Sequence, residues 1–431
     1  MKKLTASQVY LVIACLSSLA NTIMFTTYAV YYVMELGLNP FQLVLVGTIL
    51  EVTILLLENV TGVVADTYSR RLSVIIGMFV LGTAYLLEGS IPFVSETLLS
   101  NAVPLVAAVI LSEMVRGVGE TFLSGAEQAW ITDEIGDKRV GSLFIRANQL
   151  RQASMVVGVI ISVGLASISL NLPYLAGGIL FLFLGIFLVI AMPETGFKPE
   201  SPEGNSNALQ SMFFTFKNGI NSVRGRPILM LVILVTIFSG AAFEGFARLW
   251  EAHFLNTFTL PELGALEPVV WFGIINIVAN LLSIVAAEIF NRKLDTNNSS
   301  VIIRSLLILT CLQVIGLAVF GLAGNFAVGL ISYWVLVVIG TLSGPMYQAW
   351  LNQNIDSRTR ATVLSFMSQS DAFGQSAGGP VVGAVGTRFS LRAAMVFSAI
   401  LLMPAVVVYM RILTQTKTST VSDDNEEALK R

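Results

Sequence analysis

Charged side chains interrupt one long apolar stretch of the sequence at a regular spacing. Glu113, Arg116 and Glu120 follow one another at three and four residues, and Glu127 follows seven residues later. On a helix this spacing places them on one face. Arginine stays charged, whereas a carboxyl group beside it can bind and release a proton. The pattern predicts either proton chemistry, with Glu113 as carrier and Arg116 as its partner, or a purely structural buried ion pair.

Further polar residues lie deep in other apolar stretches. Glu51 and Asp371 are each far from the ends of their stretches. At about 1.5 Å per residue, both would lie near the middle of a membrane-spanning helix, where ionisable groups are costly and mark functional sites. Asp371 shares a helix face with Ser368 and Gln375, which predicts a polar path. A second such face in the first apolar stretch consists of Ser17, Asn21, Tyr28 and Tyr32.

Composition indicates what surrounds these residues. Of 431 residues, 55% are hydrophobic and 12% are charged, against about 25% charged in soluble proteins, so lipid is the expected solvent. The net charge of −2 gives no basic field for nucleic acid. Two cysteines and one histidine, His253, exclude a disulfide framework and a cysteine metal cluster. We therefore expect no metal, no cofactor and no nucleic-acid partner.

Apolar runs of about 20 residues predict membrane-spanning helices. Twelve such runs occur, near residues 9–34, 42–64, 73–95, 102–126, 149–170, 172–192, 228–256, 268–290, 300–323, 325–350, 361–386 and 389–412. The first run is too long for the core of a signal peptide, so we interpret it as a spanning helix.

Lysine and arginine predict the orientation of these spans. Of the 25 Lys and Arg residues, Arg116 and Arg248 fall within spans, and only Arg388 and Arg392 fall on the outer side if the N-terminus is cytoplasmic. The remainder lie on the inner side, as the positive-inside rule requires. Both termini are therefore expected in the cytoplasm of a bacterial cell, with the chain passing repeatedly through the inner membrane.

The predicted spans form two halves of six. We expect a first half over 1–193, a cytoplasmic linker over 194–226, a second half over 227–413 and a disordered polar tail over 414–431. Apolar residues from Leu209 to Val223 recur at helical spacing, which predicts an amphipathic helix within the linker. Two similar halves around a central path are typical of secondary transporters.

The segment between the second and third spans carries a recognisable motif. Gly62 is followed by Asp66 four residues later and by the basic pair Arg70 and Arg71 after four more. This resembles the signature loop of the major facilitator superfamily. Thr67 and Ser69 stand where that loop usually has arginine and glycine. The resemblance implies an all-α fold of twelve transmembrane helices, with Gly62, Asp66, Arg70 and Arg71 forming an inner gate.

Other stretches resemble a subgroup of that family. Residues 124–130, 192–195 and 360–365 are similar to segments of bacterial drug and macrolide exporters. The glycine-proline signature of proton-linked exporters, expected in the fifth span, is missing there. A similar string runs from Gly378 through Pro380 to Gly383 in the eleventh span. Arg116 resembles the arginine of the family's fourth span. The subgroup resemblance implies proton-coupled efflux.

The leading hypothesis is a secondary active transporter that exports small amphipathic compounds in exchange for protons. A proton-coupled nutrient or metabolite symporter is the alternative on the same fold, because fold alone does not separate the two. A non-transporting membrane sensor is a third possibility. No nucleophile motif or phosphate-binding loop occurs in the sequence, so we expect no enzyme. We expect a monomer that takes a small-molecule substrate within the lipid bilayer.

Overall fold

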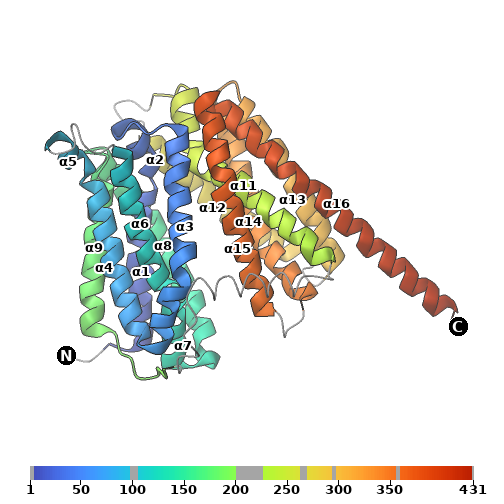
Figure 1. Ribbon diagram of the computed structural model, residues 1–431, viewed down its shortest axis with the longest axis horizontal. Coiled ribbons are helices and arrows are strands. Elements are labelled where there is room, and N and C mark those ends of the chain that lie inside the picture. Colours follow the sequence, from blue (N-terminus) through green and yellow to red (C-terminus); the bar gives the residue numbers. More distant parts are fainter. Residues whose placement is uncertain are drawn as a thin grey trace. The chain divides into compact units, whose positions relative to one another are not determined.

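Helices account for the regular structure in the computed structural model of the chain (Figure 1). The structure describes residues 4–97, 105–199, 227–262, 269–293, 298–355 and 360–429. Within these ranges no strand occurs. Helices satisfy every backbone polar group within one segment, which a chain surrounded by lipid requires. The predicted all-α class is confirmed. The predicted linker helix, residues 209–223, lies outside the described residues.

The chain divides into two compact units, which are described separately. Unit 1 comprises residues 1–212 and 261–277, and unit 2 comprises residues 213–260 and 278–431. Within unit 1, α1 packs against α8 and α9, α4 packs against α6, α7 and α9, and α3 packs against α6. The helices of unit 1 are α1 (Ala6–Phe25), α2 (Tyr28–Val30), the π-helical turn η1 (Tyr31–Glu35), α3 (Pro40–Thr67), α4 (Arg70–Gly89), α5 (Ile91–Thr97), α6 (Leu105–Leu123), α7 (Ala126–Ile135), α8 (Asp137–Ala166) and α9 (Leu172–Ala191).

Unit 2 is a second helical bundle. In it α11 packs against α15 and α16, and α13 packs against α14 and α16. Its helices are α11 (Pro227–Thr257), α13 (Ser299–Leu322), α14 (Phe326–Asn354), α15 (Arg360–Arg388) and α16 (Leu391–Leu429), while α12 (Val269–Lys293) begins in unit 1 and ends in unit 2.

Several helices begin where the sequence supplies a capping side chain. Thr5 accepts a hydrogen bond from the backbone N–H of Gln8, and the Gln8 side chain accepts one from the backbone N–H of Thr5. Asn39 and Gln42 form the same reciprocal pair at the start of α3. Each pair satisfies two backbone donors that the first helical turn leaves free. Short polar residues between apolar runs thus determine where these helices start.

Glycines set the helix breaks on either side of α7. Gly125 and Gly136 have φ angles of 71° and 80°, a conformation that side chains other than glycine disfavour. The chain therefore leaves α6 at Leu123 and restarts twice, first as α7 and then as α8. The sequence placed Glu127 on the same continuous face as Glu113; the break at Gly125 moves it to a separate helix.

Glycines also allow the closest helix crossings. A methyl group on Gly82 of α4 would lie 2.9 Å from the carbonyl oxygen of Gly178 on α9. In unit 2, a methyl group on Gly240 of α11 would lie 2.7 Å from the carbonyl oxygen of Asp371 on α15. Small residues that bring backbones together are the usual packing device of membrane helices. The second crossing places Asp371 directly against α11.

Among the described residues, ten helices are long and apolar enough to cross a membrane. They coincide with ten of the twelve predicted spans, and the chain is a multi-pass membrane protein. The other two spans correspond to α6 and α15, which are helical but more polar. In α6 the charges of Glu113, Arg116 and Glu120 lower the hydropathy, and in α15 serine, glutamine and Asp371 do so. The count of twelve crossings and the orientation of the termini stay predictions.

The last helix extends beyond its predicted span. α16 runs from Leu391 to Leu429, through residues where the sequence predicts a disordered tail. No glycine or proline follows Pro404 in the chain, and Glu, Ala, Leu and Lys near its end favour helix. Polar composition alone therefore did not end the helix.

Candidate functional site

Three charged residues of α6 meet inside unit 1. Arg116 Nη1 lies 3.0 Å from each carboxylate oxygen of Glu113, and Arg116 Nε lies 3.8 Å from Glu120 Oε1. The Glu113 side chain is 3% exposed, that of Arg116 11% and that of Glu120 35%. The helical spacing seen in the sequence thus brings the predicted acid and its arginine into direct contact. Arg116 faces two carboxylates, one enclosed and one partly open.

A fourth charged residue, Glu88, joins this group from α4. It is fully buried, and the hydroxyl of Tyr32 contacts its Oε1. The same hydroxyl lies 3.2 Å from Glu113 Oε1. Glu88 is not among the site residues that the sequence predicted. We refer to Glu88, Glu113, Arg116 and Glu120 as the carboxylate cluster.

Aromatic rings enclose the cluster. The Arg116 guanidinium lies 4.5 Å from the ring centre of Phe25 and 5.8 Å from that of Tyr85, distances at which a cation is attracted to an aromatic face. Tyr31 donates a hydrogen bond of 2.9 Å to the backbone carbonyl of Glu88. The π-helical turn η1 buries both Tyr31 and its neighbour Tyr32, although successive residues of an α-helix point in different directions. The sequence predicted that Tyr32 lines a polar path, but it did not predict the π-helical turn that directs the Tyr32 hydroxyl toward Glu88.

A cavity of about 500 Å³ lies within unit 1 beside the cluster. Glu120, Glu127, Arg151 and Asn21 are among the residues that line it. Asn21, predicted to line a polar path, lines this cavity. Its Oδ1 is buried and has no hydrogen-bond partner among the described residues, so a guest with a donor group, water included, would satisfy it. Glu120 is the member of the cluster that reaches this cavity.

Glu127 has a partner outside the row of charges that the sequence indicated. From α7 it pairs with Arg151 of α8, with 3.3 Å between Oε1 and Nη2. Burial raises the pKa of the Glu127 carboxyl, and Arg151 opposes that shift. Glu127 therefore lines the cavity and does not take part in the ion pairs of Glu113, Arg116 and Glu120 on α6.

The motif loop forms a network within unit 1. Arg70 pairs with Asp133 of α7, and its Nη2 lies 3.5 Å from Asp66 Oδ1. Arg71 Nη2 donates a hydrogen bond of 2.7 Å to the backbone carbonyl of Val189 on α9. No described atom of unit 1 lies within 4 Å of where a methyl group on Gly62 would stand. Asp66 thus lies beside Arg70 of the same motif, and the role of the motif as an inner gate stays a prediction.

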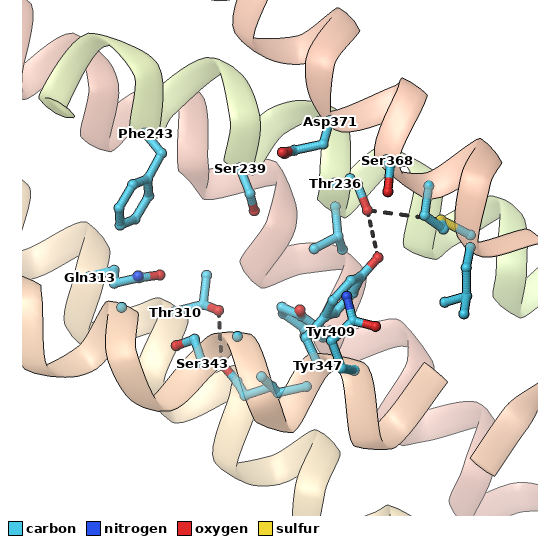
Figure 2. A pocket seen from close by; sticks show the side chains of 17 residues that line it. Thr236, Ser239, Phe243, Thr310, Gln313, Ser343, Tyr347, Ser368, Asp371 and Tyr409 are labelled. Atoms are coloured by element: carbon cyan, nitrogen blue, oxygen red, sulfur yellow. Dashed lines mark hydrogen bonds between the residues drawn. The ribbon is translucent and has the colours of Figure 1, made fainter. Parts of the chain in front are cut away.

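A second cavity, of about 440 Å³, lies within unit 2 (Figure 2). Hydroxyl, amide and aromatic side chains from five helices face it. Thr236 and Tyr347 share a hydrogen bond of 2.6 Å across it. The labelled lining residues in Figure 2 are Thr236, Ser239, Phe243, Thr310, Gln313, Ser343, Tyr347, Ser368, Asp371 and Tyr409.

Asp371 is the one carboxylate among the described residues that line the unit 2 cavity. It accepts a hydrogen bond of 2.8 Å from Gln375, the residue that the sequence placed one turn away on the same face. The α11–α15 crossing at Gly240 holds it from the other side. The site therefore presents a single acidic group among neutral hydrogen-bonding partners.

Glu51, predicted from its depth, and Glu244 are two further acids of the predicted spans. Glu51 is half-buried on α3 and is not among the described residues that line either cavity. Glu244 pairs with Arg248 at 2.8 Å on α11, one helical turn away. The structure thus brings together Glu113, Arg116 and Glu120 on α6 of unit 1, while Asp371 lines the cavity within unit 2.

Known proteins resemble this chain over most of its length. A family model described as Major Facilitator Superfamily matches residues 10–368. An uncharacterized MFS-type transporter of Bacillus subtilis (strain 168), YxaM, is 23% identical over 387 residues, covering 88% of this chain and 89% of that protein.

Solved structures show the same fold at low sequence identity. The nucleoside transporter NupG (D323A mutant) has a TM-score of 0.73 at 13% identity, over 94% of this chain and 99% of that one. A POT family transporter in complex with a thioalcohol-conjugated peptide has a TM-score of 0.69 at 13% identity, over 96% of each chain.

Proposed function

Because the chain belongs to the Major Facilitator Superfamily, a class of transporters and not of enzymes, we propose that it couples the transport of small amphipathic molecules to the movement of protons. The observation that carries the proposal is the charge imbalance of the carboxylate cluster. Arg116 is the one described cation paired within a group that holds Glu88, Glu113 and Glu120. Buried charge without a partner is strongly unfavourable, so a proton on one carboxyl relieves the imbalance.

Such a cluster suits alternating access. A transporter alternates between two states, and a ligand shifts their populations only if it binds them unequally. A carboxyl group whose neighbours change between the states binds a proton in one and releases it in the other. Glu113 faces Arg116, and Glu120 faces both Arg116 and the cavity of unit 1. Movement of Arg116 between these partners would alter the proton affinity of the cluster.

The unit 2 cavity supports the proposed class of substrate. Binding sites for small molecules combine apolar walls with a few placed polar groups. Phe243 and Tyr409 offer aromatic surface, Thr310 and Gln313 offer hydrogen bonds, and Asp371 offers one negative charge. An amphipathic molecule with hydroxyl or amine groups matches this lining.

We propose export as the direction, on the motif resemblance of residues 124–130, 192–195 and 360–365 to drug and macrolide exporters. Uptake by proton symport is the second candidate. The largely neutral, hydroxyl-rich cavity and the shared fold with a nucleoside transporter and a peptide-bound transporter favour it.

We further propose that the protein acts as a monomer in the inner membrane of a bacterium, with the proton gradient as its energy source and without a cofactor or nucleic-acid partner. The test is a transport screen in everted membrane vesicles with an imposed pH gradient. Fluorescent cationic dyes, radiolabelled uridine and a labelled dipeptide serve as probes, and vesicles without the protein are the control.

The direction of the pH gradient that drives accumulation distinguishes export from symport. Accumulation that requires an acidic vesicle interior supports export in exchange for protons. Movement of probe and proton in the same direction supports symport. Probe flux that is unaffected by the gradient would contradict proton coupling, and the absence of flux for every class of probe would favour a sensor.

A further inference from the structure

We infer that Glu88 holds the transported proton and that Tyr32 passes it to Glu113, an inference that rests on the proton coupling proposed above. The site lies where η1, α4 and α6 meet. Its evidence is the pattern of hydrogen bonds around one tyrosine hydroxyl. Neither Glu88 nor this role for Tyr32 follows from the spacing of residues in the sequence.

The hydroxyl of Tyr32 contacts two carboxyl groups. One contact is to Glu88 Oε1 and the other, at 3.2 Å, is to Glu113 Oε1. A phenol has one proton to donate and otherwise accepts. It can therefore donate to only one of two carboxylates. For both contacts to be hydrogen bonds, the other carboxyl group must be protonated and donate to the tyrosine oxygen.

The surroundings of the two acids decide which one carries the proton. Both oxygens of Glu113 lie 3.0 Å from Arg116 Nη1, and a charge-assisted contact of this kind stabilises the carboxylate. Glu88 has no ion pair among the described residues. Its buried Oε2 has no hydrogen-bond partner among them, and the hydroxyl of Ser112 at this carboxyl group donates to the backbone carbonyl of Val109. An ionised Glu88 would leave negative charge on an unpartnered oxygen, whereas a protonated Glu88 leaves only a neutral carbonyl oxygen there.

Groups from each neighbouring element surround Glu88. They provide one positive charge, on Arg116, and it is engaged with other acids. The titratable and charged groups facing Glu88 are Tyr31 and Tyr32 of η1, Tyr85 of α4, Glu113, Arg116 and Glu120 of α6, and Tyr174 of α9. The protonated form of Glu88 is thus the one that these neighbours tolerate.

Transfer requires one concerted shift. The O–H bond of Glu88 breaks as its proton joins the Tyr32 oxygen, while the O–H bond of Tyr32 breaks as its proton joins Glu113 Oε1. Tyr32 gives one proton and receives one, so it ends as it began. Glu88 becomes a carboxylate and Glu113 becomes an acid, and the net change is one proton moved between them.

Once protonated, Glu113 is connected through its partner Arg116 to the cavity of unit 1, where the proton can leave. Its partner Arg116 also contacts Glu120 at 3.8 Å, and Glu120 lines the cavity of about 500 Å³ in unit 1. When Glu113 is neutral, Arg116 is free to pair more closely with Glu120, and waters in the cavity can take the proton onward. The inferred order is Glu88, Tyr32, Glu113 and then the cavity.

The experiment locates the proton directly in the purified full-length protein, reconstituted in liposomes. Infrared spectra are recorded near neutral and at alkaline pH, in H₂O and D₂O, for the carbonyl band of a protonated carboxylic acid. We expect a band in the wild type that Glu88→Gln removes and Glu113→Gln retains. A band that Glu113→Gln removes and Glu88→Gln retains would overturn the inference, as would the lack of any such band in a wild type that couples transport to protons.

Two neighbouring tyrosines give a matched test of the transfer. Tyr32→Phe removes the hydroxyl between the carboxyl groups, whereas Tyr31→Phe removes one that binds only the backbone carbonyl of Glu88. Tyr32→Phe should keep the infrared band but slow gradient-driven flux of the probe found in the vesicle screen by about a hundredfold, as expected for loss of a positioned proton-transfer group. Tyr31→Phe should change the flux by less than about threefold on the same scale. Equal effects of the two changes would overturn the role of Tyr32.

A test of folding keeps the outcomes distinct. Size-exclusion profiles show whether each variant is folded, and if Glu88→Gln fails to fold, the Glu113→Gln spectrum and the tyrosine pair still decide. A wild type that binds a proton at Glu88 but moves no probe with the gradient would contradict the proposed function alone. A coupled wild type with its proton on Glu113 would contradict this inference alone.

Discussion

The two units handle charge in opposite ways. In unit 1, Glu88, Glu113 and Glu120 gather around a single arginine behind aromatic rings. In unit 2, a cavity of about 440 Å³ is lined by neutral hydroxyl and amide groups with one acid, Asp371. Unit 1 concentrates groups that can exchange a proton, and unit 2 offers partners for an organic molecule.

The difference suggests a division of labour. Each unit is a bundle of similar helices, yet the residues at their centres differ in chemistry because function resides in sites and not in the fold. If unit 1 carries the proton and unit 2 contributes the substrate contacts, changes in unit 1 should affect coupling and changes in unit 2 should affect affinity. The variants below test that separation.

The largest effect is expected from Arg116→Ala. Glu113 and Glu120 would lose their countercharge, and breaking a buried ion pair from one side costs about 3–5 kcal/mol. Survival of the purified variant after heating, followed by size exclusion, should fall sharply relative to the wild type. Arg248→Ala is the comparison in unit 2, where Arg248 pairs with Glu244 at 2.8 Å. Equal losses in the two variants would remove the distinction between the units.

Glu113→Gln should separate coupling from binding. The amide cannot carry a proton, so accumulation against a gradient should be abolished, while binding and downhill exchange persist. Proteoliposome flux with and without a pH gradient measures both. If the variant still accumulates its substrate, Glu113 is structural, and the coupling role passes to Asp371 and then to Glu51.

Asp371→Asn should show the opposite behaviour. A hydrogen bond to a charged group contributes about 1.5–3 kcal/mol, which corresponds to a KM raised by about ten- to a hundredfold for an amine-bearing substrate. The proton-to-substrate ratio should stay that of the wild type. Asp371→Glu, which keeps the charge, is the control. Loss of coupling in Asp371→Asn would place proton chemistry in unit 2.

Asp66→Asn should have the smallest effect. Arg70 keeps its ion pair with Asp133, and partly exposed ion pairs contribute about 0.2–1 kcal/mol, so flux should fall by no more than about fivefold. Insertion should be unaffected. Cysteines along α8 and α15 should become more accessible from the cytoplasm, and Asp133→Asn provides the comparison. Unchanged accessibility would count against a gating role for Asp66.

The sequence predicted the helices well because lipid imposes their length. Runs of apolar residues located all twelve predicted spans on helices, but not every helix end. α8 begins at Asp137, well before its predicted span. This start was missed because the first turns of α8 are polar, and the spans were predicted from apolar residues alone. The polar end of α16 was missed for the same reason.

The candidate site was predictable only along one helix. Glu113, Arg116 and Glu120 were found because residues three and four apart are neighbours on a helix. Glu88 was not, because its contact with Tyr32 joins α4 to the π-helical turn after α2 and depends on tertiary packing. The lining of the unit 2 cavity likewise comes from five helices, which no local spacing reveals.

The most direct test of the account measures proton and substrate movement together. Proteoliposomes containing wild type, Glu113→Gln or Asp371→Asn receive the probe selected in the vesicle screen, while an internal pH dye reports protons. We expect Glu113→Gln to move the probe downhill with no accompanying proton, and Asp371→Asn to move fewer probe molecules at the wild-type proton ratio. Proton movement that persists in Glu113→Gln and disappears in Asp371→Asn would contradict the account.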